Sequence, residues 1–166
     1  MVISGELLRP LHYMRQLTIG GNTHLNLTLG DEFLNMTRLT HLILSNIKLP
    51  SLNSGTFRQL RHCPLVEVDM SGCHIQSITK AAFRPLRNLT VLSLDDNTLN
   101  ASVLHDTFYG LQGAPVRELR LSNVHLQNLS PTMFIALNQS NMTTVRLRNS
   151  GRASIERRLL QSASNI

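Results

Sequence analysis

All five phenylalanines of this 166-residue chain stand at nearly equal intervals. They occur at Phe33, Phe57, Phe83, Phe108 and Phe134, with steps of 24, 26, 25 and 26 residues. An apolar triplet spaced as L-x-x-L-x-L follows each phenylalanine, and a sixth triplet precedes the first one. The triplets are Met14-Leu17-Ile19, Leu39-Leu42-Leu44, Leu65-Val68-Met70, Leu89-Leu92-Leu94, Val116-Leu119-Leu121 and Met142-Val145-Leu147. In a chain with 42% hydrophobic residues, filling 18 such positions by chance has a probability of about 10⁻⁷, so the repeat is real.

The triplet spacing predicts how each repeat folds. A short strand alternates its faces, so the second and third members of a triplet point to the same interior. Stacking repeats of about 25 residues aligns these strands into a parallel sheet. We therefore predict an α/β solenoid, a horseshoe segment of about six turns. A parallel sheet forms its concave side, and loops and short helices form its convex side, with the phenylalanines as a spine.

A ladder position follows each triplet, where an asparagine or cysteine side chain satisfies backbone groups of the adjacent repeat. The six residues at that position are Asn22, Ile47, Cys73, Asn97, Val124 and Ser150. The predicted ladder residues are Asn22, Cys73 and Asn97. Ile47 and Val124 do not fit, and in those two repeats the asparagine stands one place earlier, at Asn46 and Asn123. The sequence predicts an interrupted ladder there.

The repeat resembles a known family. The form L-x-x-L-x-L-x-x-N-x-L followed by x-x-x-F-x-x-L resembles the leucine-rich repeat, and its longer extracellular variety is similar to the ectodomains of Toll-like receptors. The resemblance is carried by DMSGCHIQSI at 69–78, NLTVLSLDDN at 88–97 and TFYGL at 107–111, and it covers about residues 7 to 150. It implies a receptor that dimerises on a microbial ligand and signals through a cytoplasmic domain absent from this sequence.

The chain begins within a repeat. Residues 7–14 align with residues 82–89, which places Leu8 in the phenylalanine position. The cysteine-bearing caps that extracellular members of this family carry are missing, and a solenoid without caps exposes its core. We predict repeats over 1–150 and a disordered non-repeat tail over 151–166. The sequence is expected to be a fragment, an incomplete gene model or a degenerate locus.

The charge is unevenly distributed. The net charge is +6, but residues 1–145 carry 11 Lys and Arg against 9 Asp and Glu, so +4 of the excess lies in residues 146–166. This distribution argues against a continuous basic surface, which makes a nucleic-acid ligand the less favoured alternative. No run of 18 apolar residues occurs, so a membrane would be reached only through a region absent here.

Glycosylation sequons indicate the compartment. Chance predicts about 2.4 Asn-x-Ser/Thr triplets in such a composition, and the chain has seven. They lie at Asn26, Asn35, Asn88, Asn100, Asn128, Asn138 and Asn141. The alternative is that the repeat template copies asparagine and threonine together. Asn88 sits at such a template position, and the other sequons are expected in different columns. The excess predicts an extracellular or lumenal glycoprotein, either secreted or the ectodomain of a membrane receptor.

Metal, disulfide and catalytic sites are not predicted. Residues 65–71 separate the pairs His62-Cys63 and Cys73-His74 by about 20 Å of strand, too far for shared zinc ligation or a disulfide. His74 and His125 share one repeat column and raise a pH-switch alternative. No nucleophile elbow, phosphate loop or paired carboxylate occurs, so we expect no enzyme and no cofactor.

The candidate ligand-binding surface is the outward face of the concave sheet, where residues between the buried triplet members form columns. The candidate residues are Glu67, Asp69, Ser93, Asp95, Glu118, Arg120, Arg146 and Arg148. They predict an acidic centre and a basic end, which suit a protein ligand better than a polyanion. The functional hypothesis is a ligand-recognition segment of a Toll-like innate immune receptor. The alternatives are a secreted or matrix adhesion protein and a non-functional receptor fragment.

Overall fold

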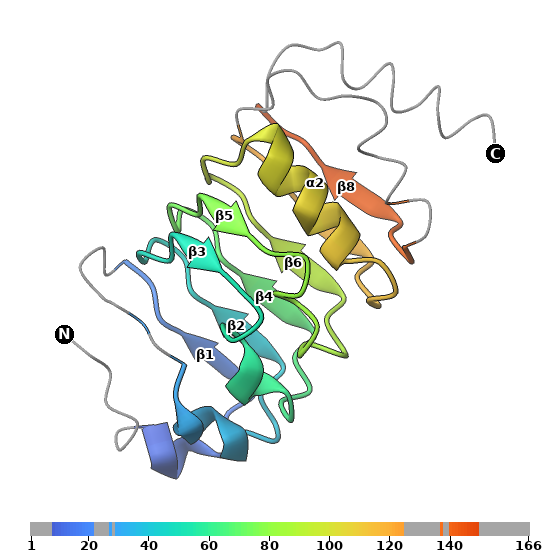
Figure 1. Cartoon of the computed structure of the whole chain (residues 1–166). Coiled ribbons are helices and arrows are strands. Elements are labelled where there is room, and N and C mark those ends of the chain that lie inside the picture. Colours follow the sequence, from blue (N-terminus) through green and yellow to red (C-terminus); the bar gives the residue numbers. More distant parts are fainter. Residues whose placement is uncertain (1–7, 22–26, 28, 125–136, 138–139, 150–166) are drawn as a thin grey trace.

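The computed structural model describes residues 8–21, 27, 29–124, 137 and 140–149. Within them, one parallel sheet of six strands runs along the molecule in the order β1-β2-β4-β6-β7-β8 (Figure 1). The strands are β1 (Gln16–Thr18), β2 (His41–Ile43), β4 (Glu67–Asp69), β6 (Val91–Ser93), β7 (Glu118–Arg120) and β8 (Thr144–Arg146). Each repeat thus contributes one strand, which confirms the predicted solenoid.

The strands pair in exact repeat register because each places the same triplet member inward. The central residues Leu17, Leu42, Val68, Leu92 and Leu119 are aligned in neighbouring strands and buried. Val145 occupies this position in β8 and is half-buried. Burial of one aliphatic side chain stabilises by about 1.5–3 kcal/mol, so each repeat gains stability mainly by covering its neighbour.

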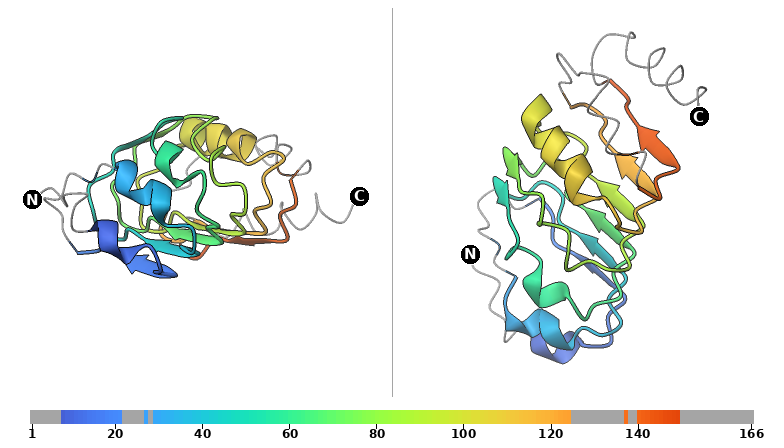
Figure 2. Two further views of the ribbon diagram at one scale, coloured as in Figure 1. Left: turned by 90° about the horizontal axis from the view of Figure 1, so that it is seen from below. Right: turned by 45° about the vertical axis from the view of Figure 1, so that its right-hand side comes forward.

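The other side of the solenoid carries a second, smaller sheet and the helices (Figure 2). Strand β3 (Ser51–Leu52) pairs in parallel with β5 (Ser77–Ile78). Three 3₁₀ helices lie at η1 (Arg9–Leu11), η2 (Asp31–Asn35) and η3 (Arg58–Leu60), and one α-helix, α2, spans Ala101–Gly110. The predicted convex side of loops and short helices is therefore found.

Helix α2 is the longest element and has a clear sequence cause. The Asn100 side-chain oxygen accepts a hydrogen bond from the Val103 amide at 3.0 Å and caps the first turn. At the other end, a Cβ added at Gly110 would lie 2.7 Å from the Lys80 carbonyl oxygen. Glycine therefore lets the helix approach the segment after β5 closely.

The phenylalanine spine is confirmed in four repeats. Phe33, Phe57, Phe83 and Phe108 are at most 2% exposed, and the rings of Phe57 and Phe83 stack with centroids 5.9 Å apart. Leu8 is buried in the same core, as its alignment with the phenylalanine position predicts. Phe134 lies outside the described residues.

Two of the three predicted ladder residues are described, and both act between repeats. The Asn97 amide nitrogen donates to the carbonyl oxygens of Met70, Leu94 and Asp95, and its oxygen accepts from the Ile75 amide. The Cys73 thiol donates to the Leu44 carbonyl oxygen at 2.9 Å. Asn22 and Ser150 lie outside the described residues.

The predicted interruption is found in the side-chain ladder. Ile47 and Val124 are fully buried and supply no polar side chain, but the backbone hydrogen bonds between repeats continue. The amides of Asn46 and Asn123 donate to the Ser71 and Arg148 carbonyl oxygens, as the equivalent residues of other repeats do. The one-place shift of asparagine therefore marks a different role.

That role is a left-handed turn in every described repeat. The residue before the ladder position has a positive φ in all six, between 53° and 72°. These residues are Gly21, Asn46, Gly72, Asp96, Asn123 and Asn149. Only glycine, asparagine and aspartate fill the column, because they adopt this conformation at the lowest cost. This Gly, Asn and Asp pattern is visible in the sequence, but it lies next to the ladder position, whose own preference for asparagine obscures it.

Replacing the ladder asparagine should destabilise the whole stack. In Asn97→Ala, the buried Met70 carbonyl and Ile75 amide lose their partner, so we expect a loss of about 2–3 kcal/mol in the free energy of unfolding. Urea unfolding of unglycosylated protein measures it. The exposed Asn88→Ala is the matched control and should cost less than about 0.5 kcal/mol. Equal effects of the two substitutions would contradict the ladder role.

Candidate ligand-binding surface

The concave sheet presents two register columns to solvent, as predicted. One is formed by Gln16, His41, Glu67, Val91, Glu118 and Thr144, and the other by Thr18, Ile43, Asp69, Ser93, Arg120 and Arg146. Side chains in one column of a parallel in-register sheet are neighbours about 4.8 Å apart. The sheet thus brings together residues that are up to 128 positions apart in the chain.

A chain of ion pairs crosses this face. Arg120 donates to Glu67 at 3.0 Å and to Glu118 at 2.7 Å, and Arg146 donates to the same Glu118 oxygen at 2.7 Å. His41 lies at the far end of the chain, with its Nε2 atom 4.0 Å from Glu67. The network therefore joins strands β2, β4, β7 and β8.

The ion-pair network corrects the prediction of an acidic centre and a separate basic end. Glu67 and Glu118 share their carboxylates with Arg120 and Arg146, so these charges compensate one another across the strands. Asp69 is also engaged, because its Oδ1 atom accepts from the Ser71 amide at 2.9 Å. Glu67, Glu118, Arg120 and Arg146 therefore form one network of paired charges, while Asp69 is held by a hydrogen bond.

Ser93 is a further correction. It was predicted to contact ligand, but it is only 2% exposed, and its hydroxyl lies 2.9 Å from that of Ser71. A small side chain in the centre of the sheet is covered by its larger neighbours. Asp95 also contributes to structure, since it accepts from the Ser122 amide of the next repeat. Arg148 is exposed beyond the end of β8.

The ion pairs shift the titration of the groups in them. Hydrogen bonds from Arg146 and then Arg120 lower the pKa of Glu118 below its usual value. The Glu118 hydrogen bond raises the pKa of Arg120. Because the pKa of Glu118 is lower in the folded protein, this carboxylate stabilises the fold above the pKa of an unfolded glutamate. That contribution is lost as the pH falls through the folded-state pKa.

We expect Glu118→Gln to reduce the acid sensitivity of the fold. The wild-type free energy of unfolding should fall more steeply than that of the variant as the pH is lowered from about 5 toward 3. Chemical unfolding at each pH measures the slope. An NMR titration of the Glu118 carboxyl in Arg146→Gln is the companion measurement, and its pKa should move up toward the ordinary value. Parallel pH profiles for wild type and Glu118→Gln would contradict the pairing.

Both cysteines are buried and unpaired with each other. Burial raises the pKa of Cys63 and of Cys73 to about 11, and the Cys63 thiol donates to the Phe33 carbonyl oxygen. Among the described residues, no three His, Cys, Asp or Glu side chains group as metal ligands. His74 is exposed, while its column partner His125 lies outside the described residues.

Four predicted glycosylation sites are described, and all are exposed: Asn35, Asn88, Asn100 and Asn141. The other three, Asn26, Asn128 and Asn138, lie outside the described residues. The sheet register places Asn88 and Asn141 in one column, which corrects the prediction that the other sequons fall in different columns from Asn88. The hydroxyls of Thr90 and Thr143 donate to carbonyl oxygens of the preceding repeat. These two sequons therefore each contain a threonine with a structural role.

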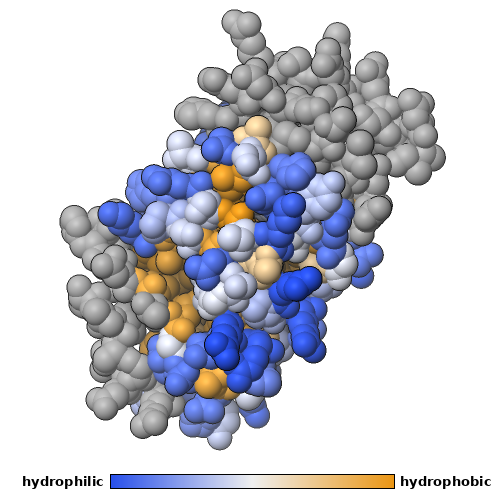
Figure 3. All heavy atoms as spheres, viewed as in Figure 1, coloured by the Kyte–Doolittle hydropathy of each residue, from blue (hydrophilic) through white to orange (hydrophobic). Residues whose placement is uncertain are grey.

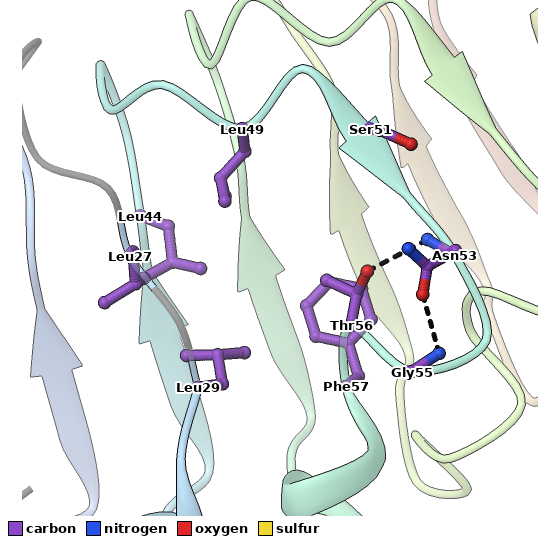
Figure 4. Close-up of a pocket in the computed structure, with 9 residues that line it drawn as sticks. All are labelled: Leu27, Leu29, Leu44, Leu49, Ser51, Asn53, Gly55, Thr56 and Phe57. Atoms are coloured by element: carbon purple, nitrogen blue, oxygen red, sulfur yellow. Dashed lines mark hydrogen bonds between the residues drawn. The ribbon is translucent and has the colours of Figure 1, made fainter.

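A hollow of about 260 Å³, which no motif in the sequence predicts, lies on the convex side. Its lining is mostly apolar, from Leu27, Leu29, Leu44, Leu49 and Phe57, together with Ser51, Asn53, Gly55 and Thr56 (Figure 4). A local turn closes one wall, where the Asn53 amide donates to the Thr56 hydroxyl and the Gly55 amide donates to the Asn53 side chain. Hydrophobic side chains are visible at the surface on this side (Figure 3).

The fold and its repeat register define a leucine-rich-repeat protein. No family model matches the sequence. The sequence does match individual curated relatives. Tsukushi of Xenopus tropicalis is 30% identical over 135 residues, which are 81% of this chain and 36% of the relative. Toll-like receptor 4 of Homo sapiens is 31% identical over 113 residues, 67% of this chain and 13% of the receptor. The chain thus spans about a third or less of these relatives.

Solved structures support the fold. TLR13 in its complex with ssRNA13 superposes with a TM-score of 0.62 at 21% identity, covering 90% of this chain and 24% of that one. Mouse RP105 in complex with MD-1 gives 0.55 at 19% identity, covering 75% and 24%. These comparisons confirm the predicted resemblance to Toll-like receptor ectodomains. No described helix is long and apolar enough to cross a membrane.

Proposed function

We propose that this chain is a ligand-recognition segment of a Toll-like innate immune receptor ectodomain, binding through its repeat surface. The observation that carries the proposal is the six-stranded concave sheet, whose outward columns present side chains from every repeat to one ligand. Relatives that include Toll-like receptor 4 support the receptor class. Recognition on such a surface is spread over several repeats and needs no catalytic group.

A protein ligand fits the concave face best. Its charges of both signs are already paired with each other, and a partner with alternating charges can exchange these pairs without leaving one uncompensated. The contact residues in this proposal are Glu67, Asp69, Glu118, Arg120 and Arg146, with Asp95 and Arg148 at its border. Among the structural neighbours, RP105 binds a protein, MD-1, and TLR13 binds an RNA.

The proposed location is extracellular or lumenal. Four exposed sequon asparagines and the similarity to Tsukushi and Toll-like receptor 4 support it. The full-length receptor would dimerise on its ligand, with the membrane reached through a region outside this sequence. The similarity to Tsukushi also favours a second candidate, a secreted or matrix leucine-rich-repeat protein acting in adhesion.

Sequencing the transcript through both ends of this segment separates these candidates. The receptor proposal expects a downstream transmembrane helix followed by a Toll/interleukin-receptor domain. A stop codon soon after a capping cysteine cluster would instead support the secreted protein. A stop directly after Ile166, with no upstream signal peptide, would make the repeats a remnant and overturn both.

A binding screen against extracellular proteins and microbial products tests the concave face. We expect the double substitution Ile43→Lys and Arg146→Glu to weaken any specific interaction at least about tenfold, because both residues lie on the sheet face. The control pair Gln76→Lys and Lys80→Glu changes the charge equally on the convex side and should bind like wild type. Equal loss in both pairs would contradict recognition by this face.

A further inference from the structure

The fold places arginines that are far apart in the sequence along one side of the concave sheet. The six residues that precede each of the first five concave strands contain five arginines and no acidic residue. These segments are 10–15, 35–40, 61–66, 85–90 and 112–117, and they contribute one arginine each. The arginines are Arg15, Arg38, Arg61, Arg87 and Arg117, and all are exposed. We call this row the arginine edge.

The segments of the arginine edge lie side by side, although the arginines stand at different positions in them, from one residue before the strand at Arg15 and Arg117 to six at Arg61. Because the strands are parallel and in register, the residues before them lie along the same side of the sheet. Backbone hydrogen bonds extend this alignment beyond the strands: the Thr40 amide donates to Arg15, Thr90 to Val66 and Arg117 to Thr90. At about 4.8 Å per strand, five repeats extend over about 19 Å.

The arginines of this edge are not neutralised by the described residues. The ion pairs of the described chain involve Arg120, Arg146, Lys80 and two histidines. Arg38 instead lies over the Tyr13 ring at 5.1 Å, and Arg61 donates to the Arg58 carbonyl and to Gln59.

The acidic residues have partners elsewhere. Glu67 and Glu118 directly follow two of the edge segments, but their carboxylates pair with Arg120 and Arg146 on the concave face. Asp31 and Glu32 lie shortly before a third segment, 35–40. Asp31 accepts from Gln59, and Glu32 accepts from the Gly30 amide. Most of the others lie on the concave sheet or in the turns after its strands, which is why residues 1–145 have almost balanced charge while one edge is basic.

We propose that the arginine edge binds a sulfated polysaccharide. Guanidinium groups donate in a fork that matches oxyanions, and a row of unpaired ones attracts a polyanion over its length. Nucleic-acid surfaces add aromatic platforms for bases. The edge segments hold one exposed phenol ring, Tyr13, which already carries Arg38 and lies against the His12 imidazole, and the remaining exposed aromatic ring is the small imidazole of His62. A ligand read by charge alone therefore fits better, and this site is independent of the concave face.

Heparin binding by the full chain tests the proposal. The triple substitution Arg38→Gln, Arg61→Gln and Arg87→Gln should weaken binding at least about tenfold and reduce the salt slope by about three. The control Lys48→Gln, Lys80→Gln and Arg148→Gln removes the same charge away from the edge and should bind nearly as wild type. Lysine at the three edge positions should restore part of the affinity, which separates lost charge from lost folding.

Two further probes assign the ligand class. Heparin stripped of its sulfates should not bind, and single-stranded RNA of equal length should bind more weakly than heparin. Tighter binding of RNA, or equal losses in the edge and control variants, would overturn the proposal. The concave pair Ile43→Lys and Arg146→Glu should retain heparin binding, so failure of the concave-face function is distinguishable.

N-glycans must be controlled in the heparin experiment, because the sequon residues Asn35 and Asn88 lie in the edge segments. Protein made without N-glycans should bind heparin at least as tightly as glycosylated protein. Heparin binding that requires the glycans would contradict direct contact with the arginines.

Discussion

The structure depends on the burial of one repeat against the next. A strand of three residues has almost no stability alone, but in register it pairs on both sides and places its central aliphatic residue in a continuous core. Everything polar in the molecule is then positioned by this stacking. The Asn97 amide satisfies carbonyls of two repeats, and the left-handed residues turn every strand in the same direction.

The sequence predicted this core well because burial repeats with a strict period. Leu8 was placed correctly in a phenylalanine position, and Cys73 in a ladder position, although neither is the usual residue there. The role of the column that holds Asn46 and Asn123 could not be predicted from residue type alone. An asparagine serves equally as an amide for a ladder and as a left-handed residue for a turn, and only the φ angle separates the two roles.

The surface was harder to predict because its energetics depend on neighbours about 25 residues away or more. Arg120 and Glu67 are 53 residues apart, yet they meet at 3.0 Å, so a column of charges that reads as two poles is a network of pairs. Ser93 was misjudged for the same reason, since its exposure is determined by the side chains of adjacent strands. The convex hollow lies between two repeats, so its lining does not follow from the motif of either repeat alone.

Both candidate surfaces follow from one property of a solenoid: equivalent segments of successive repeats lie side by side in space. Where acidic and basic residues fall in neighbouring columns, as on the concave sheet, they neutralise each other and leave a surface that a partner must match pair by pair. Where arginine recurs at varying positions before the strands, no acidic group among the described residues forms an ion pair with it, and the positive charges add over the repeats. A single arginine on a loop would be unremarkable. Five in consecutive repeats, with the acids held on another face, make a surface on which a long anion gains contact with each repeat it crosses.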